Sequence, residues 1–302
     1  MASGIKDIVI GVGHLRQQVA FYSANLGLRV LSKGRLPQQL CRELWGVDET
    51  LDTVVMGRTD VPSGVRLRLV RTSDIAARPD FDVTPPGPLG LVFAAEDVTR
   101  AYYRLSGDGV EFHSSPVTIE EGEVARRAAY GRAYDGEYLV LEQPAGDGTL
   151  SPYFGVTEPR QCQLVVRDLA AASTFFDHVL EQRAIGAEQR KGEAWRQAMG
   201  LRTGTRATVE QLASNVDEGA HTTLISYSPS VGPDNEVGPP SRGICALRYD
   251  CNALDARLEL AQTLGARVIS PPRNVESPVL GDGWVATLMP PFGVLIELWE
   301  PR

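Results

Sequence analysis

Histidine and cysteine are scarce in this chain, and their positions limit the chemistry that it could perform. The four histidines and four cysteines are His14, His113, His178, His221, Cys41, Cys162, Cys245 and Cys251. No two cysteines form a CxxC pair, and no histidine lies near them at zinc spacing, so neither a disulfide framework nor a structural zinc site is predicted. Because histidine is the commonest metal ligand and the usual general base near neutral pH, its scarcity argues against both kinds of chemistry.

The composition is that of an ordinary globular protein. Of the 302 residues, 43% are hydrophobic and 23% are charged, and 38 acidic residues exceed 30 basic ones to give a net charge of −8. An acidic balance argues against nucleic acid as a partner, because phosphate binding needs a cationic surface. No apolar run approaches the ~20 residues of a membrane span, and no signal-peptide pattern is present. We therefore expect a cytoplasmic protein with neither a membrane nor a nucleic-acid partner.

The chain repeats itself at an offset of 154 residues. The matching pairs include Ile10 with Leu164, Val12 with Val166, Phe21 with Phe175, Leu26 with Leu180 and Gly46 with Gly200. This repeat predicts two homologous halves, residues 1–145 and 153–302. They would be joined by the glycine- and proline-containing segment 146–152.

Each half divides again into two units with the order strand, helix and three strands. In the first unit, residues 7–12 read as a strand, and Leu15, Val19, Tyr22 and Leu26 recur at spacings that place them on one helical face. The same pattern restarts at Gly90. The sequence therefore predicts an α+β chain of four βαβββ modules, at about 5–75, 88–145, 159–229 and 241–302.

The modules resemble a known superfamily. The runs IGVGHLRQQVAFYSANLGLRV and LVVRDLAAASTFFDHVLEQR resemble the opening of modules in the vicinal oxygen chelate superfamily, which includes glyoxalases, bleomycin-resistance proteins and extradiol dioxygenases. The segments AYDGEYLVLEQP and MPPFGVLIELWEP resemble its closing strand. The resemblance implies two tandem domains in which paired modules form an open curved sheet, a cup with helices outside. It implies no single function, because this fold hosts unrelated activities.

The resemblance also implies where metal ligands would lie, on the first and closing strands of the modules. The first-strand positions hold Asp7, Gly90, Gln161 and Gly243, and the closing strands offer Arg68, Glu142 and Glu297. None of these is histidine, and the guanidinium of Arg68 would repel a cation. We therefore expect an Asp7–Arg68 ion pair and no cofactor. A divalent metal bound by Gln161 and Glu297 is the alternative.

Other side chains are predicted to line the cup of the second half. Strand alternation places Gln163 beside Gln161, Cys245 beside Gly243 and Trp299 beside Glu297. We expect Trp284 to join this wall, and Trp45 and Trp195 to roof the two cups. Gly90 and Gly243 either leave room for a bound organic group or only allow close strand packing. An apolar wall with a few polar groups is typical of a small-molecule site.

The function favoured by the sequence is that of a metal-independent enzyme. It would act on a small, partly apolar carbonyl or aromatic compound by isomerase or lyase chemistry in the second cup. Glu297 would be the acid or base, and Gln161 would stabilise an oxyanion. One alternative is a non-catalytic drug- or metabolite-binding or resistance protein, and another is a metal-dependent glyoxalase or dioxygenase. In every case the expected partner is a small molecule, and the chain would be a monomer or a homodimer.

Overall fold

The computed structural model describes residues 2–61, 63–72, 83–121, 124–143, 155–215, 219–232 and 236–302. Within these ranges the four predicted modules are present, and the α+β class is confirmed. The segment 146–152, predicted to join the halves, lies outside the described residues. Of the described helices, none is both long enough and apolar enough to cross a membrane.

The first two modules occupy the first half of the chain. The first contains β1 (Ile5–Val12), α1 (Leu15–Leu26), β2 (Arg29–Leu36), α2 (Gln38–Trp45), β3 (Leu51–Gly57) and β4 (Arg66–Arg71). The second contains β5 (Gly87–Ala95), α3 (Val98–Gly107), β6 (Glu111–Phe112), β7 (Val117–Glu121), β8 (Val124–Arg132) and β9 (Tyr138–Gln143). As the sequence predicts, Gly27 ends α1 in the left-handed conformation, with φ of 67°.

The other two modules occupy the second half. The third contains β10 (Val156–Val165), α4 (Leu169–Leu180), β11 (Gln182–Arg190), α5 (Glu193–Ala198), β12 (Arg206–Ser214) and β13 (His221–Ser228). The fourth contains β14 (Gly243–Asp250), α6 (Leu254–Thr263), β15 (Arg267–Ser277), β16 (Gly281–Met289) and β17 (Leu295–Pro301). Helix α4 begins where the Asp168 side chain accepts a hydrogen bond from the Ala171 N–H at 2.9 Å.

The modules pair across the two halves of the chain, which differs from the tandem pairing expected from the repeat. One sheet has the order β15-β16-β17-β14-β1-β4-β3-β2, and the other has the order β11-β12-β13-β10-β5-β9-β8-β6. The first module therefore joins the fourth, and the second joins the third. A repeat shows which modules are alike, but contacts between residues far apart in the chain decide which first strands pair, as Ile8 on β1 does with Leu247 on β14.

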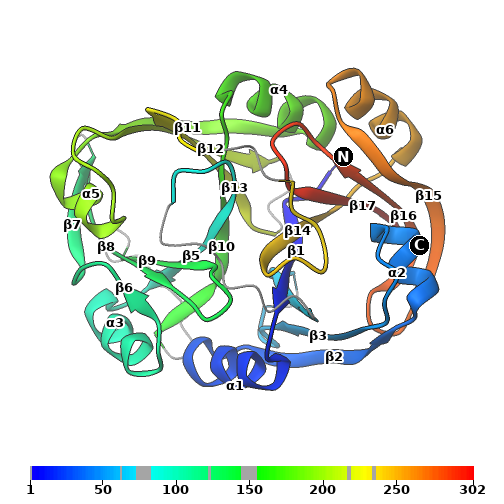
Figure 1. Cartoon of the computed structure of the whole chain (residues 1–302), viewed down its shortest axis with the longest axis horizontal. Coiled ribbons are helices and arrows are strands. Elements are labelled where there is room, and N and C mark those ends of the chain that lie inside the picture. The colour runs from blue at the N-terminus through cyan, green and yellow to red at the C-terminus, as the bar shows by residue number, and fades with distance from the viewer. Residues whose placement is uncertain are drawn as a thin grey trace.

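We call the concave face of the first of these sheets cup A and that of the second cup B. Figure 1 shows the two sheets side by side, with α1 and α3 at one end of the molecule and α4 and α6 at the other. The convex faces share one apolar core with these helices, which includes Ile8, Leu91 and Phe176. This core fixes the two cups back to back.

Polar contacts also hold the two sheets together. Asp135, in the turn between β8 and β9, accepts from the backbone N–H of Gly13 at 3.0 Å and from the guanidinium of Arg242 at 2.6 Å. The hydroxyl of Tyr22 on α1 donates to Glu137 at 2.7 Å, and both side chains are buried. Buried charged groups with such partners fix the position of one sheet on the other.

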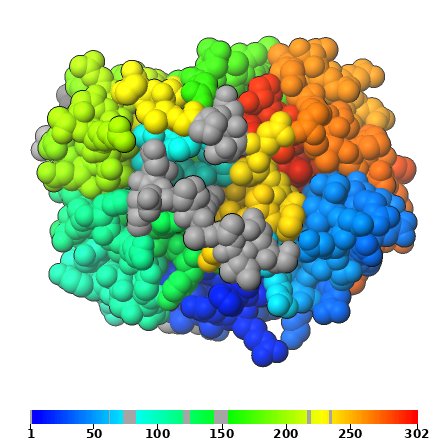
Figure 2. Space-filling view, viewed as in Figure 1, coloured from blue at the N-terminus to red at the C-terminus, as the bar shows by residue number. Residues whose placement is uncertain are grey.

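The short helices α2 and α5 lie on the concave sides of the sheets. Trp45 at the end of α2 is buried in the apolar cluster of cup A, and Trp195 of α5 is buried in that of cup B. In Figure 2 the blue segment that contains α2 and the yellow-green segment that contains α5 cover opposite sides of the same face. Both tryptophans therefore roof the cups as the sequence predicts.

Candidate functional site

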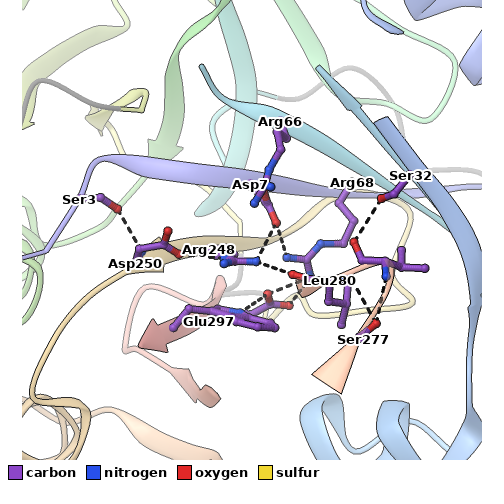
Figure 3. A network of polar contacts seen from close by, with 12 residues as sticks. Ser3, Asp7, Ser32, Arg66, Arg68, Arg248, Asp250, Ser277, Leu280 and Glu297 are labelled. Atoms are coloured by element: carbon purple, nitrogen blue, oxygen red, sulfur yellow. Dashed lines mark hydrogen bonds and ion pairs between the residues drawn. The ribbon is translucent and has the colours of Figure 1, made fainter. Parts of the chain in front are cut away.

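Three charged side chains that the sequence singles out meet at the centre of cup A. Arg68 on β4 donates to Asp7 on β1 at 2.7 Å and to both oxygens of Glu297 on β17 at 2.9 Å. Arg68 and Glu297 are 0% exposed and Asp7 is 2% exposed. Figure 3 shows the guanidinium of Arg68 lying between the two carboxylates. The expected Asp7–Arg68 ion pair is confirmed, and Glu297 makes it a triad.

Two further arginines surround Asp7. Arg66 donates to Oδ1 of Asp7 at 2.6 Å. Arg248 on β14 lies 3.6 Å from Oδ2, the oxygen that Arg68 binds, and stacks over Trp299 at 3.9 Å from the ring centroid. Burial alone would raise the pKa of Asp7, but the charges of Arg68, Arg248 and Arg66 outweigh it and hold that pKa well below its ordinary value. Asp7 is therefore an ionised structural carboxylate at neutral pH.

Glu297 has no oxygen left over for a substrate. Besides Arg68, the indole of Trp45 donates to Oε1 at 2.9 Å and the indole of Trp299 donates to Oε2 at 3.3 Å. An acid or base must reach the reacting proton, and this carboxylate lies beneath α2 with its charge matched by a guanidinium. The geometry therefore gives Glu297 a structural role in place of the expected catalytic one.

The ionisation of Asp7 predicts a dependence of stability on pH. A pKa that is lower in the folded state contributes stability above the unfolded value of about 4, and that contribution is lost as pH falls toward the folded pKa. Chemical unfolding would be measured at intervals from pH 6 to pH 2. The free energy of unfolding should fall more steeply with decreasing pH in the wild type than in Asp7→Asn. Parallel profiles would contradict the assignment.

The residues of cup A do not fit the divalent metal that the family resemblance implies. Arg68 places a cation between the two carboxylates that such an ion would need, so a metal would meet a fixed positive charge. In the part of the chain that the structure describes, no group of three or more histidine, cysteine, aspartate or glutamate side chains could hold a metal ion.

The predicted catalytic partners lie in different cups. Glu297 belongs to the sheet of β1 and β14, whereas Gln161 and Gln163 lie on β10 in the other sheet. The expectation that Glu297 and Gln161 act on one substrate is therefore wrong. It failed because it assumed that modules of the same half share a cup.

Not all of the other residues predicted to line the cup of the second half face a cup. Cys245 and Trp299 belong to the apolar cluster of cup A, and Gly243 is a backbone position with φ of 82° at the start of β14. Trp284 is 46% exposed and lies on the face of β16 that carries Ala286 of the convex core. The prediction that Trp284 lines a cup is therefore wrong, because its strand register turns it outward.

Cup B has a polar floor built from two parallel strands. On β10, Gln161 and Gln163 alternate with the outward-facing Cys162, and Thr223 on β13 lies beside them. The Thr223 hydroxyl donates to the Gln161 carbonyl oxygen at 2.8 Å. Gln163 is 1% exposed, and its carbonyl oxygen Oε1 is buried without a hydrogen-bond partner. Buried amide oxygens are normally satisfied, so this one marks a position where a donor is expected.

Aromatic side chains form the wall above this floor. Tyr130, Tyr138 and Tyr227 come from β8, β9 and β13 and pack in one buried cluster with Trp195. The rings of Trp195 and Tyr227 are stacked, with centroids 6.3 Å apart and planes at 15°. Apolar and aromatic walls around a few polar groups are typical of small-molecule sites.

Glycine at position 90 serves packing in this cup. A Cβ there would lie 2.6 Å from both the Cβ and the carbonyl oxygen of Tyr138 on the neighbouring strand. The absence of a side chain thus allows β5 and β9 to approach each other. Of the two interpretations left open by the sequence, close strand packing is the one that the structure supports.

Ion pairs link charged side chains from different strands of the sheet of cup B. Arg126 on β8 lies 3.3 Å from Glu142 on β9 and 3.5 Å from Glu188 on β11, at the other edge of the sheet. Arg190 also pairs with Glu188. Glu142 therefore faces the cup as predicted, but it is held by an arginine.

A histidine lies at the rim of the same cup. The Nε2 atom of His113 is 3.4 Å from the hydroxyl of Tyr138, and the ring lies against Gly200, just beyond α5. Burial, aided by the charge of Arg132, lowers the pKa of His113 from its ordinary value. The imidazole is therefore neutral near pH 7 and could accept a proton.

The sequence did not predict a role for several residues that the structure places in the two cups. Those missed in cup A are Arg66, Arg248 and the hydrogen bond of Trp45, and those missed in cup B are Thr223, Tyr130, Tyr138, Tyr227, Arg126 and Glu188. Strand alternation alone would have placed Thr223, Ile225 and Tyr227 on one face of β13. No local signal reveals that β13 and β8 share a cup, since their contacts depend on module pairing.

Comparisons with known proteins agree with this architecture. Residues 4–131 match the family model of the Glyoxalase/Bleomycin resistance protein/Dioxygenase superfamily. The fold is similar to that of glyoxalase I from Zea mays, with a TM-score of 0.67 at 15% identity over 99% of this chain and 92% of that one. A mutant of that enzyme gives a TM-score of 0.70 at the same identity and the same coverage of both chains.

A putative dioxygenase from Bacillus subtilis gives a TM-score of 0.61 at 14% identity over 99% of this chain and 85% of that one. At these identities the likeness to solved structures concerns the fold alone. The comparison with curated proteins gives no match.

Proposed function

We propose that this chain, of which residues 4–131 match the model of the Glyoxalase/Bleomycin resistance protein/Dioxygenase superfamily, binds a small, partly apolar organic molecule in cup B without using a metal. The observation that carries this proposal is the buried, unpartnered carbonyl oxygen of Gln163 on the floor of an aromatic cup. A ligand that donates a hydrogen bond to this oxygen would remove the cost of burying it unsatisfied.

The contrast between the cups supports this assignment. In cup A both carboxylates are bound by the guanidinium of Arg68, of which only Nε is buried without a partner, and Trp45 lies over them. In cup B the amides of Gln161 and Gln163 have hydrogen-bonding capacity left for a ligand. Cup A therefore stabilises the fold, and cup B supplies the binding site.

The roof of cup B gives the first test of this proposal. Trp195→Ala removes an aromatic wall, and we expect it to weaken the binding of ring compounds found by calorimetric screening about tenfold or more. The matched control is Trp284→Ala, which removes an outward-facing tryptophan and should leave affinity unchanged. Circular dichroism would establish that both variants are folded. Equal affinities for the wild type and Trp195→Ala would contradict the assignment of cup B.

A second candidate function, isomerase or lyase chemistry by proton transfer, is favoured by His113. Its neutral imidazole at the rim could take a proton from a carbon next to a carbonyl, while the amide of Gln161 donates to the resulting enolate oxygen. Return of the proton to another carbon would complete an isomerisation. This candidate retains the predicted class of reaction but moves the base from Glu297 to His113.

Hydrogen exchange distinguishes the enzyme from the binding protein. For a bound carbonyl compound in D₂O, the enzyme should exchange the proton next to the carbonyl at a rate that NMR can follow. His113→Asn should abolish this exchange, whereas His178→Asn, at an exposed position on α4, should not. Tight binding without exchange in the wild type would support the binding protein alone.

A further inference from the structure

The hydroxyl of Thr223 sets the direction of the Gln161 amide. Because this hydroxyl donates to Oε1 of Gln161 at 2.8 Å, the Nε2 group points to the other side of the amide. Among the residues that the structure describes, Nε2 of Gln161 donates to none. Gln161 thus offers hydrogen-bond donors toward the cup.

Gln163 offers a hydrogen-bond acceptor where Gln161 offers donors. It lies two residues further along the same face of β10, about 6–7 Å away along the strand. Its buried carbonyl oxygen accepts no hydrogen bond. The floor therefore combines one donor and one acceptor on neighbouring side chains of one strand face, where both can bind the same edge of a ligand.

From this pair we infer that the ligand of cup B is an uncharged, planar ring compound with an N–H group beside a carbonyl, as in a lactam or cyclic amide. The inference rests on the proposed binding function and gives its ligand class. The ligand carbonyl accepts from Gln161, and the ligand N–H donates to Gln163. A compound with acceptors only, such as an ester or an N-alkylated amide, leaves the Gln163 oxygen buried and unsatisfied.

The charges around cup B argue for a neutral ligand. Arg126 lies beside Glu142 and Glu188, and Arg190 pairs with Glu188, so two positive charges face two negative ones. Against these paired charges of the described residues, a charged ligand would lose its hydration without gaining a counter-charge of its own.

The wall argues for a flat ligand. Trp195 and Tyr227 are stacked nearly parallel, and Tyr138 lies in the same cluster beside Gly90. Planar rings bury their faces well against such side chains, while the edge of the ring remains available for the amides of the floor.

A pair of probes that differ by one methyl group tests this inference. We would measure the affinities of 2-quinolone, N-methyl-2-quinolone and quinoline-2-carboxylate by isothermal titration calorimetry with the wild type, Gln163→Met and Gln189→Met. The wild type should bind 2-quinolone about tenfold to a hundredfold more tightly than its N-methyl derivative, and the carboxylate should bind more weakly still. Gln163→Met should reduce the preference for the N–H compound to nearly nothing, whereas Gln189→Met, on the exposed edge strand β11, should retain it.

The outcomes separate the two proposals. If all three probes bind and the first two bind equally well to the wild type, a water molecule satisfies Gln163; the lactam inference is then overturned, but the binding function stands. A preference for 2-quinolone that survives in Gln163→Met also overturns it. If neither these probes nor the wider set of ring compounds binds, the binding function itself fails.

Discussion

Replacement of Arg68 by methionine should lower the free energy of unfolding by about 3–5 kcal/mol, because it leaves two buried carboxylates without their shared counter-charge. Arg68 is 0% exposed and donates to both Asp7 and Glu297. Urea unfolding followed by circular dichroism would measure the loss. In a protein of ordinary stability, a loss of this size is a large part of the total free energy of unfolding.

An exposed ion pair provides the matched control for this experiment. Arg35 pairs with Asp52 at 2.8 Å, but its side chain is 70% exposed. Arg35→Met should change the free energy of unfolding by about 1 kcal/mol or less. Similar losses in the two variants would show that the network of cup A does not stabilise the fold.

Glu297→Gln should have the second-largest effect, a loss of about 3 kcal/mol or more in the free energy of unfolding. The neutral amide weakens the attraction to Arg68, and its NH₂ group replaces an oxygen that accepts from an indole or from Arg68. Ligand affinity at 20 °C, where the variant remains folded, should not change, because Glu297 is not part of cup B.

This variant also separates the structural role of Glu297 from the catalytic role that the sequence suggests. A catalytic acid or base could be replaced by its amide with loss of turnover and little loss of stability. The control is Glu236→Gln, which alters an exposed pair with Arg267 and should be nearly neutral. Wild-type stability combined with lost turnover in Glu297→Gln would contradict the role assigned here.

Local patterns in the sequence predict much of the fold. The spacing of Leu15, Val19, Tyr22 and Leu26 predicts α1, and Gly27 marks its end. The repeat predicts four modules because each module carries its own strand and helix pattern. These features depend on residues that are close together in the chain, where periodicity is informative.

The pairing of modules is the part that the sequence could not provide. Strand β1 has the same alternation whether its neighbour is β5 or β14, and only tertiary packing selects β14. That choice decides that Arg68 meets Glu297, and that Gln161 shares a cup with the tyrosines of the second module. The Asp7–Arg68 pair was predictable because both residues belong to one module, whereas the partners of Glu297 and Gln161 were not.

The most direct test of the division between the two cups is a crystal structure of the wild type bound to the ring compound that calorimetry identifies as the tightest ligand. We predict that this compound lies in cup B, against Trp195, with a hydrogen bond to the carbonyl oxygen of Gln163. The Asp7–Arg68–Glu297 triad should remain intact beneath Trp45. A ligand bound in cup A, with Trp45 displaced and Glu297 in contact with the compound, would contradict the account.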